Sequence, residues 1–357
     1  MHTNEMTYAG APGGRLNRRR MLGGAAAGLA LPAALVLGGS RAYAQDVAAK
    51  AYDPVPETAL GPAIPEQGYL VEEIGGGLYW VTDGVYQAMF LVSGEGVIVV
   101  DAPPTIGNNL LRAIADVTEE PITHVVYSHH HADHIGAAVI YPAEAERIAH
   151  VKTAELLEAA PDPNRPPPTR TFEDEFDLQV GNQTLHLEFR GGNHSPDNIF
   201  IWAPRQETLL LIDVVFPGWV PFKELAQSQD IPGWIAAHDQ ALSYPFATLV
   251  SGHLGRLGTR EDVEVQQAYL TDLRAASEEA LINVDFGAIY QRIGPGNAWA
   301  LFEAYLDEVS ARAAESTLET WRGKLGGADV FTYSNAFKMA ESLRIDYGVL
   351  GPFGIRP

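Results

Sequence analysis

Residues 128–136 read Ser-His-His-His-Ala-Asp-His-Ile-Gly and contain a metal-ligand pattern of the form H-x-H-x-D-H. The run 122–127 before them is apolar and β-branched, which predicts a buried strand that ends at this loop. In extended backbone, positions i and i+2 point the same way, so His129 and His131 can hold one ion together. Asp133 and His134 lie further along the turn and can reach a second ion. Imidazole and carboxylate groups suit Zn²⁺ and its neighbours, whereas a solvated histidine-rich loop is the alternative interpretation.

Four ligands on one loop leave two ions unsaturated, so partners are expected elsewhere in the chain. Three downstream residues each follow a probable strand: His194 after 185–189, Asp213 after 209–212 and His253 after 248–252. Ligands at the carboxyl ends of strands can converge at one edge of a layered sheet. The sequence therefore predicts a two-ion site built from seven side chains: His129, His131, Asp133, His134, His194, Asp213 and His253.

This order of ligands resembles the metallo-β-lactamase superfamily over about residues 69–260. The resemblance implies an α/β fold, a four-layer αββα sandwich with the metals at one edge of its two sheets. It also implies that His129, His131 and His194 bind the first metal and that Asp133, His134 and His253 bind the second. Asp213 would bridge the two ions, and Asp101 would orient a ligand from outside the ligand set, as metal-bound imidazoles usually require.

The composition narrows the chemistry further. The chain has 357 residues and no cysteine, which excludes disulfides and thiolate ligands, including the cysteine ligand of some β-lactamases in the superfamily. Its formal net charge of −21 disfavours nucleic acid and anionic membranes as partners. A small-molecule substrate is the expected partner, with no membrane contact once the N-terminal segment is removed.

The N-terminus is typical of an export signal. Arg18, Arg19 and Arg20 precede a mildly apolar run over 23–37, and the small-x-small sequence at 42–44 offers a cleavage site. The paired arginines resemble a twin-arginine signal over residues 1–44, which predicts a periplasmic or secreted protein. A membrane anchor is the alternative, but the apolar run is short for a span and contains Pro32.

Composition and hydrophobic periodicity divide the rest of the chain into three segments. Residues 45–68 are rich in proline, alanine and glycine and are expected to form an extended strap. Strand and helix patterns alternate through a catalytic domain at 69–260. Helical patterns then dominate the extension at 261–357, with helices expected at 262–281, 299–314, 318–325 and 334–343. This extension offers a surface for a homodimer.

Several further residues have two interpretations. Four aromatic residues near Asp213 could line an apolar pocket or belong to the core: Phe216, Trp219, Phe222 and Trp234. Lys223 could bind a substrate carboxylate. Ser195 and Asn198 could contact substrate or stabilise their own loop. His130 should point away from the ions, because it alternates with His129 and His131.

Two ions a few ångströms apart can share a water and lower its pKa, which yields a bridging hydroxide. Asp133 could orient that nucleophile. The predicted function is a binuclear zinc hydrolase, with iron or manganese as other metals, acting on a small ester, lactone or amide, with a β-lactam as a special case. The alternatives are an iron-dependent dioxygenase of the same superfamily and a non-catalytic, metal-binding periplasmic protein.

Overall fold

The computed structural model describes residues 51–354, so the expected signal segment at 1–44 and the start of the strap lie outside the described residues. Residues 51–69 contain one 3-10 turn, η1 (Glu57–Ala59), and no other regular element. Within 51–354, no helix combines the length and the apolar character that a membrane span requires.

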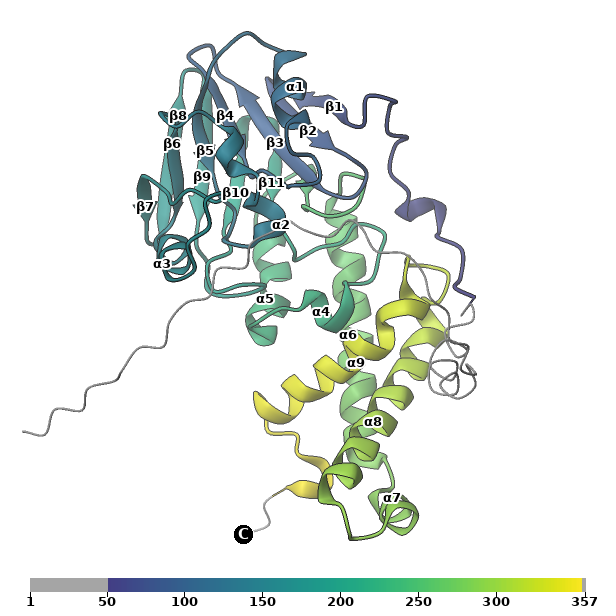
Figure 1. Cartoon of the computed structure of the whole chain (residues 1–357). Coiled ribbons are helices and arrows are strands. Elements are labelled where there is room, and N and C mark those ends of the chain that lie inside the picture. Colours follow the sequence, from purple (N-terminus) through teal and green to yellow (C-terminus); the bar gives the residue numbers. More distant parts are fainter. Residues whose placement is uncertain (1–50, 355–357) are drawn as a thin grey trace, which may run out of the picture. The chain divides into compact units, whose positions relative to one another are not determined.

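The strands form two mixed β-sheets, which lie in the upper part of Figure 1. The larger has seven strands in sequence order, namely β1 (Leu70–Gly75), β2 (Leu78–Thr82), β3 (Gln87–Val92), β4 (Val97–Val100), β5 (Ile122–Val126), β6 (Glu146–His150) and β7 (Arg170–Phe172). The smaller has five strands in the order β12-β11-β10-β9-β8, namely β8 (Glu175–Val180), β9 (Gln183–Glu188), β10 (Phe200–Ala203), β11 (Thr208–Leu210) and β12 (Thr248–Val250). Strands β4 to β7 pair in parallel, and so do β11 and β12.

Helices cover both outer faces of this sheet pair. The described α-helices are α1 (Asn109–Ala115), α2 (Ala132–Ile135), α3 (Val151–Ala159), α4 (Lys223–Ala226), α5 (Ile231–Leu242), α6 (Arg260–Asn283), α7 (Phe286–Ile293), α8 (Ala298–Trp321) and α9 (Ala328–Ile345). Further 3-10 turns are η2 (Ala138–Ile140), η3 (Pro204–Gln206) and η4 (Gly351–Phe353).

The two-residue period of the strands creates the layers. On β4, Val99 packs in a buried cluster with Leu110 of α1, while its neighbour Ile98 packs in the cluster between the two sheets. On β11, Leu210 faces the other sheet and Leu209 packs in a cluster with α5 and the C-terminal helices. Alternate residues therefore bury opposite faces, and the α/β sandwich predicted from the sequence is confirmed.

The C-terminal helices α6, α8 and α9 continue the core of the smaller sheet. Buried residues of all three, such as Tyr269, Tyr305 and Met339, belong to the same apolar cluster as Trp234 of α5. Helix α6 begins with a capping box in which the Thr259 and Asp262 side chains bond each other's backbone N–H groups. The tail is thus packed on the sandwich through a shared core.

Some predicted elements differ from the structure. Helix α8 runs unbroken where two helices were expected, because its buried face continues through Ala314, Thr317 and Trp321. The Thr317 hydroxyl is satisfied within the helix, since it bonds to the Ala313 carbonyl at 2.8 Å. The short elements β7, α4 and α7 were not predicted. Helix α7 carries a capping signal, since the Asp285 side chain accepts a bond from the Ala288 N–H. Helix α4 has left-handed backbone angles that no helical periodicity encodes.

Replacing Ile98 by alanine should lower the free energy of unfolding by about 2–5 kcal/mol, because this fully buried side chain fills the space between the two sheets. Urea unfolding followed by circular dichroism measures the effect. The control is Ile282→Ala, whose side chain is 61% exposed and whose loss should change stability by less than about 0.5 kcal/mol. Equal losses in the two variants would contradict this account of the core.

Candidate metal centre

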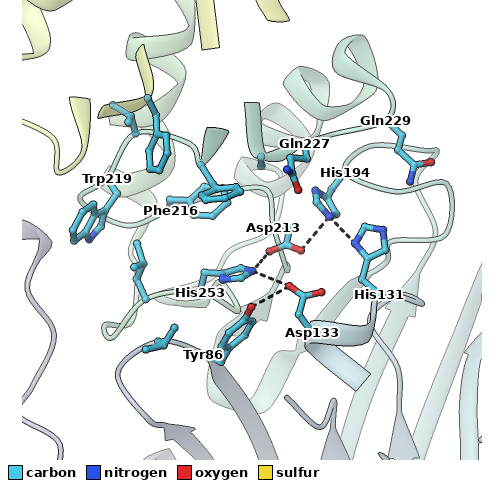
Figure 2. A pocket seen from close by; sticks show the side chains of 16 residues that line it. Tyr86, His131, Asp133, His194, Asp213, Phe216, Trp219, Gln227, Gln229 and His253 are labelled. Carbon is cyan, nitrogen blue, oxygen red and sulfur yellow. Dashed lines mark hydrogen bonds and ion pairs between the residues drawn. The ribbon is translucent and has the colours of Figure 1, made fainter. Parts of the chain in front are cut away.

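Seven histidine and aspartate side chains meet at one edge of the sheets. Figure 2 shows five of them, His131, Asp133, His194, Asp213 and His253. The loop after β5 brings His129 and His131, and the short helix α2 brings Asp133 and His134. His194 lies between β9 and β10, and the other two residues follow the paired parallel strands β11 and β12. The structure therefore brings together every metal-ligand candidate of the sequence: His129, His131, Asp133, His134, His194, Asp213 and His253.

One group consists of His129, His131, His194 and Asp213, whose ligand atoms all lie within 4.8 Å of one another. The His194 Nε2 atom is 3.0 Å from His131 Nδ1 and 3.1 Å from Asp213 Oδ2. His129 Nε2 lies 3.6 Å from the same Asp213 oxygen. Three imidazole nitrogens thus face a common point beside one carboxylate, which is a donor set that suits a borderline divalent ion.

The second group consists of Asp133, His134 and His253. The Nε2 atoms of His134 and His253 are 3.2 Å apart, and each lies within 3.6 Å of Asp133 Oδ2. Asp213 also faces this group, with Oδ2 3.0 Å from His134 Nε2 and Oδ1 2.9 Å from His253 Nε2. Because Asp213 touches both groups, its carboxylate is placed to contact an ion in each.

Unpaired buried atoms support metal binding here. His129 is fully buried, its Nδ1 lies 3.0 Å from the Ser128 hydroxyl, and its Nε2 has no hydrogen-bond partner although it faces the ligand cluster. Buried polar atoms are rarely left unpaired, and each costs about 1–3 kcal/mol when they are. A cation between the nitrogens would satisfy them, so the residues present fit a pair of divalent metal ions.

Burial and mutual charge set the protonation of these ligands. Burial lowers the pKa of His129 and His194 and lowers that of His131 to about 4, so these imidazoles are neutral and able to ligate near pH 7. Burial alone would also lower the pKa of His134, but the carboxylates of Asp213 and Asp133 raise it to about 9. Before a metal binds, His134 therefore carries the proton that a cation would displace.

Asp101, directly after β4, positions Ser128 and through it the ligand His129. Its Oδ1 accepts a hydrogen bond from the Ser128 N–H at 2.8 Å, and the Ser128 hydroxyl in turn contacts the ring of His129. Both Asp101 and Asp213 have left-handed backbone angles, with φ of 62°. Non-glycine residues adopt this conformation at a cost, and they do so most often at functional sites.

Asp197 joins the two ligand loops. Its buried carboxylate accepts bonds from the backbone N–H and Nδ1 of His130, from the Ser195 hydroxyl and from the Thr153 hydroxyl on α3, each at 2.8 Å. Burial would raise the pKa of Asp197, but these donors hold it below its ordinary value. His130 consequently points away from the cluster, as alternation predicts, and Ser195 stabilises its own loop.

Trp234 and Asn198 hold Asp213 in place. The Trp234 indole N–H donates to the Asp213 carbonyl at 2.9 Å, and the Asn198 amide donates to the preceding carbonyl of Ile212 at 2.8 Å. Both side chains are fully buried. Of the two interpretations offered for each, Trp234 is a core residue and Asn198 stabilises the protein rather than facing a substrate.

A cavity of about 610 Å³ opens beside the cluster. Its lining includes five of the seven ligand candidates, namely His131, Asp133, His194, Asp213 and His253. The other lining residues are Val85, Tyr86, Phe216, Trp219, Val220, Phe222, Ala226, Gln227, Gln229, Leu254 and Phe331. Three of the four candidate aromatics therefore line a pocket. Lys223 is not among the lining residues and lies 4.0 Å from Glu224 at the surface.

Among the lining residues that the sequence did not indicate, two are aromatic, Tyr86 and Phe331. The Tyr86 hydroxyl donates to Asp133 Oδ2 at 3.3 Å, and the Tyr86 ring packs 4.6 Å from the His253 ring (Figure 2). Its place at the start of a strand-like run gave no sign of this contact. Phe331 comes from α9, about 80 residues after the last ligand, and no spacing connects it with the site.

Comparisons with known proteins agree with this geometry. Residues 81–253 match the family model described as the metallo-beta-lactamase superfamily. Over 201 residues the chain is 27% identical to the 2,4-dinitroanisole O-demethylase subunit alpha of Nocardioides sp. (strain JS1661), covering 55% of this chain and 61% of that protein. Over 125 residues it is 26% identical to a metallo-beta-lactamase type 2 of Bacillus sp. (strain 170), covering 34% and 47%.

Solved structures with a similar fold include a metallo-beta-lactamase from Pontibacter korlensis. It is 23% identical, has a TM-score of 0.49, and the match covers 57% of this chain and 99% of that one. The chain spans about half to three-fifths of the curated relatives named above.

Replacing Asp197 by alanine should lower the free energy of unfolding by about 3 kcal/mol and reduce bound metal, because four buried donors lose their acceptor and the two ligand loops lose their link. Urea unfolding and elemental analysis measure the two effects. Asp177→Ala is the control, since that side chain is 73% exposed and pairs only with partly exposed His186. Full metal content in Asp197→Ala would show that the link is dispensable.

Metal binding should release a proton from His134 near pH 7.5, because the pKa of His134 is raised to about 9 in the metal-free protein. Zinc affinity should therefore rise with pH up to about 9 and level off above it. Titration calorimetry in buffers of different ionisation enthalpy counts the released protons. The His134→Ala variant should release about one proton fewer, and an unchanged count would refute the assignment.

Proposed function

Because residues 81–253 form a domain of the metallo-beta-lactamase superfamily, we propose that this protein is a metal-dependent hydrolase of small esters, lactones or amides, using two zinc ions. The observation that carries the proposal is the position of the ligand cluster, since Asp133 and His253 are partly exposed on the wall of a 610 Å³ cavity. A catalytic metal site needs such an open side, whereas a purely structural site is closed.

In the proposed reaction, the residues of the site would bind the metal ions and orient the attacking water. His129, His131 and His194 would hold one ion, Asp133, His134 and His253 the other, and Asp213 would contact both. Divalent ions held there would lower the pKa of a water towards neutrality and would polarise the scissile carbonyl. Asp133, 44% exposed and facing the cavity, accepts a hydrogen bond from the attacking water and orients it. Tyr86 donates to Asp133 and so fixes the carboxylate for this task.

A second candidate reaction is cleavage of an activated aryl methyl ether. The relative from Nocardioides carries the name of an O-demethylase acting on 2,4-dinitroanisole, and the match covers 61% of that protein. Phe216, Trp219 and Phe222 give the present cavity an aromatic lining that suits such a ring. An activated water can add to the electron-poor ring carbon that bears the methoxy group. The bond from that carbon to the methoxy oxygen then breaks, and the leaving group takes a proton and departs as methanol, which leaves the phenol.

We also propose that the protein is exported. The support lies in the sequence alone: paired arginines at 18–20, an apolar run over 23–37 and a small-x-small site at 42–44. Cell fractionation of the full chain, compared with a variant in which Arg18, Arg19 and Arg20 are replaced by lysine, tests this part separately from catalysis.

The zinc-loaded protein should turn over at least one member of a panel that contains a chromogenic ester, a lactone, a cephalosporin and a nitroaryl methyl ether. The His131→Ala variant should lose at least about a hundredfold in kcat/KM, because it removes a ligand from the first ion. Elemental analysis should find two zinc ions in the wild type. Iron in their place, with oxygen uptake, would support the dioxygenase alternative.

His186→Ala is the matched control, since His186 is a partly exposed histidine that pairs with Asp177 away from the cavity. Its kcat/KM should stay within about twofold of the wild type. Failure of the two-zinc protein to turn over any member of the panel would count against the hydrolase, and equal activity in His131→Ala would exclude a role for the metal cluster.

A further inference from the structure

The C-terminal helix α9 reaches the candidate active site. Phe331, in the first turn of α9, lines the same cavity as the metal ligands, and its ring packs 5.2 Å from the ring of Phe222. We propose that α9 forms the substrate-specificity wall of this pocket and that the wall binds an uncharged aromatic group of the substrate. This inference rests on the proposed hydrolase and names the substrate class that its pocket accepts.

The connection before α9 is fastened to the pocket wall. The Gly326 N–H donates to the Gly218 carbonyl at 2.9 Å, and the Val220 N–H donates to the Gly326 carbonyl at 3.1 Å. These bonds form a small parallel bridge between Trp219 and Gly326. A Cβ atom on Gly326 would lie 2.5 Å from the Trp219 ring, so glycine is what allows the indole to pack against this backbone.

Asn335, on α9, hydrogen-bonds to the backbone of the segment that forms the other side of the wall. Its side-chain oxygen accepts a bond from the Leu225 N–H at 2.8 Å, and its amide donates to the Pro221 carbonyl at 2.9 Å. The segment that it holds, 224–227, has four consecutive residues with φ between 54° and 60°. L-residues rarely adopt this left-handed conformation in a run, so the segment depends on outside partners such as the fully buried Asn335. Its last two residues, Ala226 and Gln227, line the cavity.

The chemistry of the wall indicates what it binds. The side chains opposite the ligands are aromatic or aliphatic, and among the lining residues there is no lysine or arginine. Gln227 and Gln229 are neutral groups that lie on the His194 and His131 side of the pocket (Figure 2). A distal carboxylate or phosphate would therefore lose its hydration without gaining a partner, whereas a flat uncharged ring would pack among Phe222, Trp219 and Phe331.

The test uses 2-naphthol binding and two acetate esters, 2-naphthyl acetate and ethyl acetate, with the full zinc-loaded chain. Calorimetry should show that the wild type binds 2-naphthol and that Phe331→Ala binds it about tenfold more weakly, because a ring contact is lost. For 2-naphthyl acetate, Phe331→Ala should raise KM by about tenfold and leave kcat within about twofold. For ethyl acetate, kcat/KM should stay within about twofold. Phe331→Leu keeps apolar bulk, so its KM for 2-naphthyl acetate should lie between those of the wild type and Phe331→Ala.

Val330→Ala is the matched control, because Val330 is the neighbouring residue on α9, is 37% exposed and does not line the cavity. It should behave as the wild type, and all variants should retain their zinc and their thermal transition. The naphthol measurement stands even if neither ester is hydrolysed, so it separates this inference from the proposed reaction. Failure of the wild type to bind 2-naphthol, or equal binding by Phe331→Ala, would overturn it.

Discussion

The site depends on one electrostatic constraint, the crowding of polar ligand atoms in a space that excludes water. Four of the ligand histidines lie within 3.6 Å of an Asp213 oxygen, and each of the other two ligands, His131 and Asp133, lies within 3.6 Å of one of those histidines. Neutral imidazole nitrogens with lone pairs aimed at one another are unfavourable without a cation between them. The fold holds this arrangement by surrounding it with satisfied hydrogen bonds, most of all the buried carboxylate of Asp197 and the indole of Trp234.

Much of the fold follows from local pattern. Short runs of mainly apolar, β-branched residues placed β4 and β5 correctly, because β4 is buried on both faces and the end of β5 is buried as well. The four left-handed residues at 224–227 could not be predicted, since none is a glycine and their conformation depends on Asn335, more than 100 residues later. The break expected between residues 314 and 318 is absent, since the buried face of α8 continues through Thr317.

The ligand residues could be predicted from local sequence, whereas the roles of the residues around the pocket could not. Histidine and aspartate at strand ends have a recognisable spacing, and parallel pairing of β11 with β12 is enough to bring Asp213 and His253 together. The roles of the aromatic residues depend instead on tertiary contacts. Trp234 and Phe216 lie within the same stretch of sequence, yet one anchors a carbonyl in the core and the other faces the cavity. Tyr86 and Phe331 have no local signal because each is brought to the site by packing alone.

The position of Phe331 near the end of the chain has a consequence for biosynthesis. A ribosome delivers the last metal ligand, His253, long before it delivers α9. The strands that carry Asp213 and His253 share one apolar cluster with α6, α8 and α9, so their outer face is covered only after these helices have been made. The ligand cluster and the Phe331 side of the cavity are therefore expected to reach their final positions together, once α9 has packed.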